Sequence, residues 1–446
     1  MTGIGLRRAP AGTAGMLVLA LLALRPSSAR AGAQPDPGAL PPPAVSDSPP
    51  QAPPPAPAPA AGALTLDETI ALAMRANPTL VAARLRAPVA RAGIVVAREI
   101  PNPELTFEES KETPHDALTL AQPIEVAGKR RRRIAVAEAE TALAEADADA
   151  VAAEVRSRVR RAYAQLAAAQ RRAAETGSLA TLAGRTTEAA RDRFESGAAP
   201  RLDVLQAELA SMQADNDAIG ARAELTAARA ELNAQLARDP EAPLEAADEL
   251  EAGEVPVLET AVAWAIAGSA ELRAATRRIE AALARVDLAR AGQYPDPTVS
   301  GSITHRGEPE FHTGWRASLV MILPLFTHHQ GAVAIEERTV EQLRAEREAS
   351  EASVRARIAA ARSRAAALRE QALRYRDAML PRAAEVEAMA EDAYRSGQTN
   401  LASMTLTIQS SRDVRLRAVQ AGLDYQLALD DLEQALGAPL PRRSTP

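Results

Sequence analysis

Apolar residues recur at alternating intervals of four and three through much of the chain, which is the spacing of helices that pack side by side. In one stretch this spacing is shared by Val354, Ile358, Ala361, Ala365, Leu368, Ala372, Tyr375 and Met379. At 1.5 Å per residue, the uninterrupted stretch from 129 to 195 would form a helix of about 100 Å. The pattern therefore predicts four long helices, at about 129–195, 201–237, 331–395 and 401–436.

Two shorter regions alternate with period two instead, which predicts strands. They lie at about 102–125 and 297–325, and each holds two segments. In the second region the residues expected on one face are Trp315, Ala317, Leu319 and Met321. The segments are near the length that a tilted strand needs to cross a bilayer. A soluble hairpin has the same pattern, so the alternation alone leaves both interpretations open.

The chain repeats itself at an interval of about two hundred residues. The stretch "IPNPELTFEES" from Ile100 is echoed by "YPDPTVSGSIT" from Tyr294. Further on, "RFESGAAPRLDVLQAE" from Arg193 is echoed by "AYRSGQTNLASMTLTI" from Ala393. Echoes in the same order indicate a duplicated unit. Each unit is expected to run helix, two strands and two long helices, so the predicted fold is mainly α with a small β part.

The N-terminus predicts export from the cytoplasm. Arg7 and Arg8 precede the apolar run "MLVLALLAL", and small-residue cleavage sites follow, which is the layout of a secretory signal peptide. The apolar run is too short for a spanning helix, which needs about 20 residues. A proline-rich stretch comes next and is typical of a spacer, with an SH3-type ligand as the alternative. A capping box at Thr65 and Glu68 marks the first folded helix, and Asn77-Pro78 breaks it.

These features divide the chain into six segments. We expect a signal peptide at 1–31, a tether at 32–63, a first repeat at 64–238, an inter-repeat segment at 239–257, a second repeat at 258–437 and a tail at 438–446.

The composition narrows the classes of function. Only 2% of the 446 residues are aromatic, which favours long alanine-rich helices over conventional cores. A net charge of -6 argues against nucleic-acid binding, and the absence of cysteine rules out disulfides and thiolate metal sites. The five histidines lack the spacing of a closed metal site. Without a nucleophile elbow, phosphate loop or paired catalytic carboxylates, we expect neither an enzyme nor a bound cofactor.

Hydrogen-bond accounting predicts an oligomer if the strands lie in a membrane. Four strands from one chain cannot close a barrel, and an open sheet edge in lipid would leave backbone groups without partners. Several copies would therefore have to pool their strands.

The ordered motifs "PNPEL", "QPIEVAGKR" and "RFESGAAPRLDVLQAE", with their repeats, resemble the TolC-type outer-membrane efflux factors over about 64–437. The likeness is greatest to the CzcC-like branch, which serves metal-exporting pumps. This resemblance implies a homotrimer with a shared twelve-stranded β-barrel in the outer membrane and a hollow α-helical barrel in the periplasm. It also implies a periplasmic adaptor, an inner-membrane RND-type pump and passive conduction, with heavy-metal cations as the expected substrate. The alternatives are a drug- or polypeptide-exporting channel of the same fold, or a soluble periplasmic coiled-coil scaffold or adaptor.

The resemblance assigns docking of the adaptor and pump to the two tips where the long helices reverse. The residues that match the tip pattern are Arg193, Gly197, Leu202, Arg395, Gly397 and Leu401. The glycines are expected to adopt positive φ, and the leucines to occupy grooves of the adaptor. A role restricted to the turns is the alternative.

A pore constriction is also implied near the tips. Asp203 matches an acidic position there, and three copies would form a carboxylate ring that attracts cations. The second repeat has Ser403 at the matching position, which departs from the family pattern. An ordinary surface role for Asp203 is the alternative.

A run of five cations follows Gly128, where the strands are expected to meet the helices. It comprises Lys129, Arg130, Arg131, Arg132 and Arg133. Cations at a membrane interface can contact anionic headgroups, for about 1 kcal/mol each. We therefore predict a membrane-interface anchor, with a solvated helix start as the alternative. Nucleic-acid binding lacks support because no aromatic residues are interspersed.

Overall fold

The computed structural model describes residues 63–247, 256–307, 311–437 and 440. The chain divides into two units, Met1–Ala56 and Pro57–Pro446, and all described elements belong to the second. The predicted signal peptide and nearly all of the predicted tether and tail lie outside the described residues. Within the described ranges, no helix combines the length and apolar character needed to cross a membrane.

The first repeat contains five helices and two long strands. In chain order these are α1 (Leu66–Ala76), α2 (Pro78–Arg84), α3 (Arg86–Arg98), β2 (Glu104–Glu109), β3 (Asp116–Pro123), α4 (Lys129–Glu195) and α5 (Arg201–Gln235). The Thr65–Glu68 capping box is present, and Asn77 caps α2 through its side chain. The predicted break at Asn77-Pro78 is present. Leu85 makes a second break that was not predicted, so three helices precede the strands where one was expected.

The second repeat follows the same order. Its elements are α6 (Leu258–Gly268), α7 (Ala270–Ala291), β5 (Thr298–Gly307), β6 (Phe311–Val320), α8 (Gln330–Arg374), the π-helical turn η1 (Tyr375–Met379), α9 (Leu380–Arg395) and α10 (Leu401–Leu436). Two short strands, β1 (Ala63–Leu64) and β4 (Glu245–Ala246), pair in parallel near the start and end of the first repeat.

The π-helical turn explains a small shift between the repeats. Val155 and Val354, 199 positions apart, occupy corresponding buried sites. Past η1, Gly197 and Gly397 correspond and are 200 positions apart. The second repeat has therefore gained one residue between these points. A π turn closes its hydrogen bond over one residue more than an α turn, so η1 accommodates the extra residue without ending the helix.

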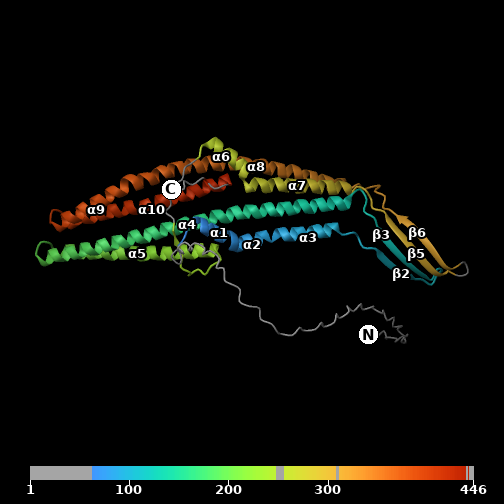
Figure 1. Ribbon diagram of the computed structural model, residues 1–446, viewed down its shortest axis with the longest axis horizontal. Coiled ribbons are helices and arrows are strands. Elements are labelled where there is room, and N and C mark those ends of the chain that lie inside the picture. Colours follow the sequence, from blue (N-terminus) through green and yellow to red (C-terminus); the bar gives the residue numbers. More distant parts are fainter. Residues whose placement is uncertain (1–62, 248–255, 308–310, 438–439, 441–446) are drawn as a thin grey trace, which may run out of the picture. The chain divides into compact units, whose positions relative to one another are not determined.

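Within the second unit, the helices run between the four-stranded sheet at one end and two hairpin tips at the other (Figure 1). The tips are the α4–α5 and α9–α10 reversals. One core cluster joins α1, α4 and α5, and a matching cluster joins α6, α8 and α10. Val354, Ile358 and Ala365, which follow the four-three spacing in α8, are buried in the second cluster, as the pattern predicts. The same spacing along α5 remains exposed at Leu205, Leu209, Met212 and Ile219.

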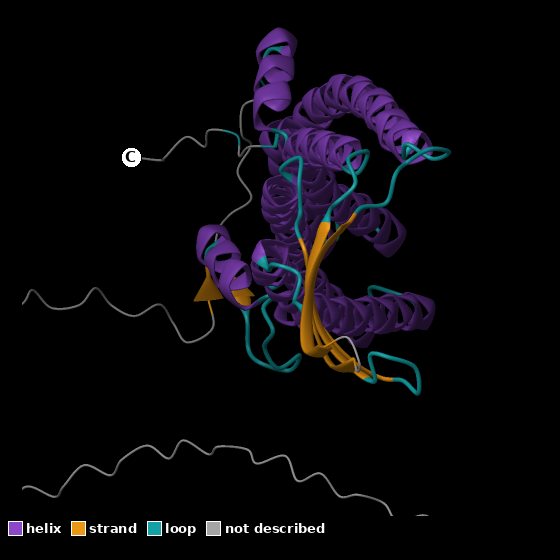
Figure 2. Cartoon of the chain, turned by 90° about the vertical axis from the view of Figure 1, so that its right-hand side faces the viewer, coloured by secondary structure: helices purple, strands orange, loops and turns teal. Residues whose placement is uncertain are grey.

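The sheet has the order β2-β3-β5-β6, and all neighbouring strands are antiparallel. Figure 2 views the molecule from the sheet end, with the strands seen nearly edge-on in front of the helices. The β3–β5 pairing joins the two repeats, so β2 and β6 are its two edges. Leu118 lies opposite Ile303 in that pairing. No described strand pairs with the outer edge of either β2 or β6.

Candidate transport and docking sites

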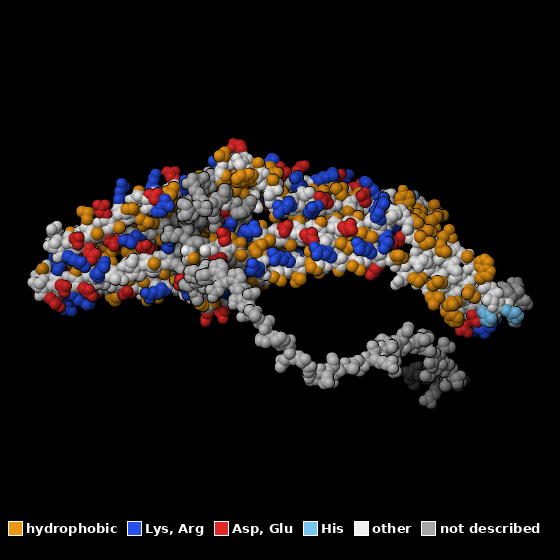
Figure 3. Space-filling model, in the orientation of Figure 1, with side chains coloured by type: hydrophobic (Ala, Val, Ile, Leu, Met, Phe, Trp, Pro, Cys, Tyr) orange, Lys and Arg blue, Asp and Glu red, His pale blue; other side chains and the backbone are white. Residues whose placement is uncertain are grey.

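The sheet has one apolar and one polar face. Pairing aligns one apolar row across all four strands, made of Phe107, Leu118, Ile303 and Trp315. These side chains are exposed, Trp315 at 83%. The opposite face carries small hydroxyl residues, with hydrogen bonds between Thr119 and Ser302 (3.1 Å) and between Ser300 and Ser318 (2.6 Å). Hydrophobic side chains are visible over this end of the molecule in Figure 3. An exposed apolar row facing away from a polar one suits a sheet with lipid on one side and water on the other.

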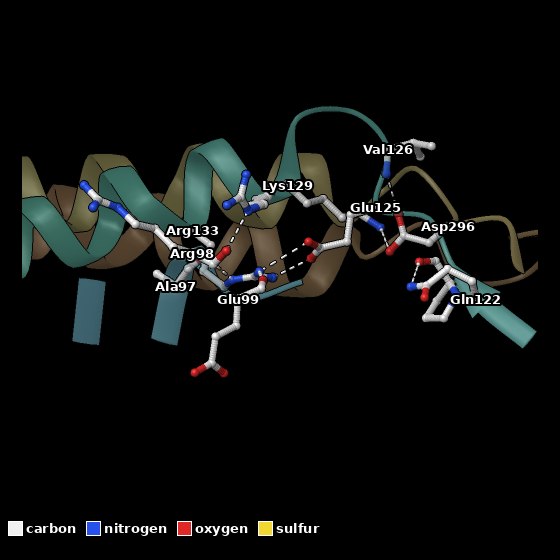
Figure 4. Close-up of polar contacts among 11 residues, drawn as sticks. Ala97, Arg98, Glu99, Gln122, Glu125, Val126, Lys129, Arg133 and Asp296 are labelled. Carbon is white, nitrogen blue, oxygen red and sulfur yellow. Dashed lines mark hydrogen bonds and ion pairs between the residues drawn. The ribbon is translucent and has the colours of Figure 1, made fainter. Parts of the chain in front are cut away.

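The junction between β3 and α4 is held by a carboxylate from the second repeat (Figure 4). Asp296 accepts a hydrogen bond from the backbone N–H of Val126 (2.9 Å) and from Nζ of Lys129 (2.8 Å). Partial burial by itself would raise the pKa of Asp296, but these two hydrogen bonds outweigh it and hold the pKa below its ordinary value. The Lys129 side chain is only 16% exposed. The contact therefore fastens the two repeats where strands give way to helices.

The rest of the basic run mostly contacts the protein itself. Arg133 forms an ion pair with Glu125 and donates to the carbonyls of Ala97 and Glu99. Arg130 donates to the carbonyl of Arg98 (2.8 Å). These carbonyls belong to the last turn of α3, where helical backbone acceptors lack partners within the helix.

Local contacts thus change the interpretation of the predicted interface anchor. Lys129, Arg130 and Arg133 hold the junction, and Arg132 donates to the carbonyl of Ala127 (3.0 Å). Arg131 is exposed, and it is the one cation of the run without a hydrogen-bond or ion-pair partner among the described residues. A lipid contact by this run therefore falls mainly to Arg131. Sequence reasoning missed the internal role because Asp296 lies far away in the chain.

The second repeat builds the same junction from apolar residues. After β6, exposed side chains include Ile322 (81%), Leu325 (72%) and Phe326 (93%). Together with Tyr294 they border a hollow of about 730 Å³. The basic run of the first repeat has no counterpart here, because Thr327, His328 and His329 precede α8. Sequence analysis did not single out this run as a surface feature.

Both hairpin tips reverse through a glycine. Gly197 has φ of 76° and Gly397 has φ of 75°, which confirms the expected positive φ. The hydrogen bonds match as well, since Ala198 N donates to Arg193 O (2.7 Å) and Gln398 N donates to Ala393 O (2.8 Å). A Cβ added at either glycine would meet no atom within 4 Å. The requirement for glycine is therefore conformational, and both turns are open to the surroundings.

The two tip leucines lie in opposite environments. Leu202 is 60% exposed, whereas Leu401 is 2% exposed and packs with Met404, Tyr394 and Ala190 between the hairpins. The sequence prediction treated both as docking residues. The burial corrects this for Leu401, because a side chain enclosed between two hairpins of its own chain has no surface left for a groove on another protein.

The tips are tied together by Arg193 and Tyr394. Arg193 donates to the carbonyl of Tyr394 (2.8 Å), and its guanidinium lies 4.9 Å from the centre of the tyrosine ring. The Tyr394 hydroxyl is buried without a hydrogen-bond partner among the described residues. Burial raises the pKa of Tyr394, and nearby Asp203 raises it further, while Arg193 acts in the opposite direction. Arg395 instead forms an ion pair with Glu391 (2.8 Å) on its own helix.

The predicted constriction residues both lie in the first turn of a returning helix. Asp203 donates its backbone N–H to the carbonyl of Pro200 (3.0 Å). Ser403 donates its backbone N–H to the side chain of Asn400 (2.9 Å), which caps α10. Asp203 is partly exposed and Ser403 is exposed. Both side chains are accessible, but a ring would need further copies of the chain.

A groove of about 430 Å³ lies between α4, α5 and α10 on the tip side of the helices. Its apolar lining includes Leu179, Leu209 and Ile408, and its polar lining includes Asp217 and Arg412. These last two residues form an ion pair at 2.7 Å. The groove is therefore lined partly by apolar and partly by charged side chains.

Buried charges connect the two halves farther along the helices. Asp430 is 5% exposed and accepts from Ser157 Oγ (2.7 Å) and Arg161 Nε (2.8 Å). Burial raises the pKa of Asp430, against the opposing effect of these two hydrogen bonds. Arg160 and Glu433 form a neighbouring ion pair. Within the described ranges, no group of three or more His, Asp or Glu side chains is arranged to hold a metal ion.

Comparison with known proteins places the chain in a family. Residues 69–238 and 262–438 match the family described as outer membrane efflux protein. The chain belongs to the outer membrane efflux protein family. The two matched segments correspond to the two repeats, and the family consists of export conduits of the outer membrane rather than enzymes.

Individual proteins resemble this chain at low identity, one in sequence and two solved structures in fold. The cobalt-zinc-cadmium resistance protein CzcC of Cupriavidus metallidurans is 28% identical over 374 residues, covering 83% of this chain and 89% of CzcC. The outer membrane protein VceC of Vibrio cholerae is 20% identical with a TM-score of 0.69, covering 84% of this chain and 96% of VceC. A membrane protein from Pseudomonas aeruginosa is also 20% identical, with a TM-score of 0.71 and coverage of 83% and 92%.

Proposed function

We propose that this efflux-family chain is the outer-membrane channel of a tripartite export system and works as a homotrimer. Three copies would pool their sheets into a twelve-stranded β-barrel, and their long helices would continue it as a hollow tube. The observation that carries this proposal is a sheet with an exposed apolar face and two open edges. In lipid such edges need strand partners, and further copies of the chain supply them.

Outer-membrane lipid would surround the apolar face of the sheet. The apolar row from Phe107 to Trp315 would contact acyl chains, and Arg131 would contact headgroups at the boundary. The exposed run around Ile322 and Phe326 extends the apolar surface to the start of α8.

A periplasmic adaptor and an inner-membrane RND-type pump would dock at the hairpin tips. The docking surface we propose contains Arg193, Gly197, Leu202, Arg395 and Gly397, and excludes Leu401 for the reason given above. The open turns and the exposed Leu202 support this proposal, as does the groove beside α5. The channel would conduct passively, with energy supplied by the pump.

Asp203 would form the acidic part of the pore constriction, alternating with Ser403. Three carboxylates around a threefold axis attract cations and repel anions. The relative CzcC is named for resistance to cobalt, zinc and cadmium, and we infer that divalent metal cations are the substrate here as well. The protein would need no resident metal site, since a passive tube leaves selection to its pump.

A deletion strain tests this function. We expect the strain to become sensitive to cobalt, zinc and cadmium salts and to regain resistance when the wild-type gene is returned. The Asp203→Asn variant should restore resistance only in part, while Ser403→Ala should restore it fully. Sensitivity to drugs but not metals would favour a drug channel of the same fold. Sensitivity to neither would contradict metal export.

A soluble periplasmic scaffold is the second candidate, and the long helices alone would suit it. The exposed row on the strands argues against it, since a soluble protein rarely leaves several large apolar side chains together in water.

A further inference from the structure

The contact between the two halves of this chain offers a template for the contact between copies. The second half lies beside the first through β3–β5, α4–α7 and α4–α10. The elements that correspond to this internal contact lie at the outer margins of the chain, β2, α3 and α5 on one side and β6, α8 and α9 on the other. Among the described residues they pack mainly against elements of their own half, and no described strand pairs with the outer edge of β2 or β6. In a closed ring built from duplicated units, these margins meet. The argument rests on the proposed homotrimer.

Corresponding positions follow from the structure. Ala87 and Ala281 are both buried and 194 apart, and this interval also relates the Pro101 and Pro295 motifs that precede the strands. For β3 and most of α4 the interval is 199, as for Val155 and Val354. Beyond η1 it is 200. Each contact between a first-half and a second-half residue therefore defines two positions expected to meet at the boundary between copies. The side-chain chemistry is not always kept, since the internal pair Arg285–Glu140 (2.6 Å) transfers to Arg91 and Thr339.

The strand register transfers first. Ala121 on β3 pairs with Ser300 on β5. Ala121 corresponds to Val320, because each is paired with the first residue of the neighbouring strand, Glu104 and Thr298. Ser300 corresponds to Thr106. Val320 of one copy is thus expected opposite Thr106 of the next.

Charge complementarity supports the same alignment along the helices. Internally, Glu175 pairs with Arg415 at 3.1 Å. At the outer margins, Glu175 corresponds to Arg374 and Arg415 corresponds to Asp215. Acid and base have therefore changed places, and the two positions still carry opposite charges. Arg374 has 71% of its side chain exposed, and Asp215 is also exposed.

Two further internal ion pairs also correspond to oppositely charged residues at the outer margins. The internal pair Arg185–Glu391 (3.5 Å) transfers to Glu385 and Arg191, again with both signs exchanged. The internal pair Arg278–Asp147 (2.9 Å) transfers to Arg84 and Glu346 with signs retained.

The buried network shows the opposite case, in which both charges disappear. Arg161 and Asp430 pair internally at 2.8 Å, and their counterparts are Ala360 and Ala230. A buried charge without its partner would destabilise the protein. Both members of this pair are replaced by alanine, so neither charge remains without the other.

We propose that the surface formed by β6, α8 and α9 binds α2, α3, β2, α5 and the tip end of α4 of a second copy of this chain, in the register of the internal contact. Val320 then faces Thr106 of the neighbouring copy, Arg374 pairs with Asp215, Glu385 with Arg191 and Glu346 with Arg84. The signs are exchanged in two of these three ion pairs and retained in the third, so the charge pattern of this contact differs from that of the internal one.

Disulfide cross-linking of the full chain in outer membranes tests the register, since the wild-type protein has no cysteine. The double variant Thr106→Cys/Val320→Cys should give covalent dimers and trimers that reducing agent dissolves. The control Glu108→Cys/Val320→Cys shifts one cysteine by two residues on the same strand face. Its Cβ atoms would be about 7–8 Å apart, too far for a disulfide. Equal or stronger linkage in the control, or none in either variant, would overturn the register.

A charge exchange tests the helical part. Asp215→Arg and Arg374→Asp should each lower the temperature at which the purified oligomer dissociates in detergent. The double variant Asp215→Arg/Arg374→Asp should return it to the wild-type value. Additive losses in the double variant would overturn the pairing. Metal resistance conferred by the unmodified chain reports on the proposed function separately, so an intact, exporting oligomer that fails both tests would refute this contact alone.

Discussion

The two halves of the molecule share an order of elements and differ in where they place polar and apolar residues. At the strand-to-helix junction the first half is polar and closed by Asp296, Lys129 and Arg133, while the second exposes Ile322 and Phe326. At the tips the relation is reversed, since the first half exposes Leu202 and the second buries Leu401. The two halves therefore keep the same order of elements, but the first is polar at its junction and exposes its tip leucine, whereas the second is apolar at its junction and buries its tip leucine.

The largest stability difference is expected between the tip leucines. Leu401→Ala should lower the free energy of unfolding by about 2–5 kcal/mol, because it leaves a cavity in a packed cluster. Leu202→Ala should change it by no more than about 0.5 kcal/mol, as for other surface sites, yet reduce metal resistance. Thermal unfolding in detergent and growth on metal salts measure the two effects. Similar stability losses in both variants would contradict the proposed division of roles.

The two strand-to-helix junctions should show the next largest difference in the free energy of unfolding. Asp296→Ala removes the acceptor of Val126 N–H and the partner of a mostly buried Lys129, and should cost about 1–3 kcal/mol. Its counterpart in the first half is Asn102, whose side chain forms no hydrogen bond to any residue that the structure describes, and Asn102→Ala serves as the matched control. Denaturant unfolding in detergent compares them. An equal loss in the control would show that Asp296 has no special part in fastening the halves.

The pH dependence of this junction has a defined sign. The pKa of Asp296 is lowered in the folded protein, so its contribution is present above the unfolded value of about 3.9 and is lost as pH falls through the folded pKa. Asp296→Asn should therefore flatten the loss of stability below about pH 4. Buried Asp430, whose pKa is raised, contributes in the opposite sense and weakens the folded state as pH rises through its folded pKa. Unfolding curves recorded from pH 3 to 7 would reveal an unchanged acid slope in Asp296→Asn if this account were wrong.

The tip glycines should show a smaller stability effect with a large functional one. Gly197→Val or Gly397→Val forces a β-branched residue into positive φ, at a cost of about 1–2 kcal/mol. We expect oligomer and membrane insertion to persist while export is abolished, because the docking turns change shape. Gly220→Val, in the middle of α5 with open space around it, is the control. Normal metal resistance in the tip variants would defeat the assignment of docking to these turns.

The last contrast lies within the basic run. Arg131→Gln should change stability by no more than about 0.5 kcal/mol, whereas Arg133→Gln breaks an ion pair and frees helix-end carbonyls, for about 1–3 kcal/mol. Arg131→Gln should instead weaken binding of the detergent-solubilised protein to anionic vesicles. If Arg133→Gln alone weakened that binding, the assignment of lipid contact to Arg131 would be wrong.

Local patterns predicted the elements well where one residue's preference decides the geometry. The α4 helix spans the expected 129–195, and the Thr65 cap and the two positive-φ glycines lie where the motifs indicated. Sequence analysis missed contacts between residues far apart in the chain. Asp296 gave no sign that it would hold Lys129, and Leu401 looks equivalent to Leu202 until its neighbours are known. The break between α2 and α3 was not predicted, because Leu85 ends α2 without a glycine or proline.

The most direct test of an outer-membrane channel is where the protein resides and in what assembly. Membranes from cells expressing the full chain should be separated by density and extracted with detergent. The protein should appear in the outer-membrane fraction and elute as three copies that separate on heating. A compact monomer released into the periplasm without detergent would contradict the account.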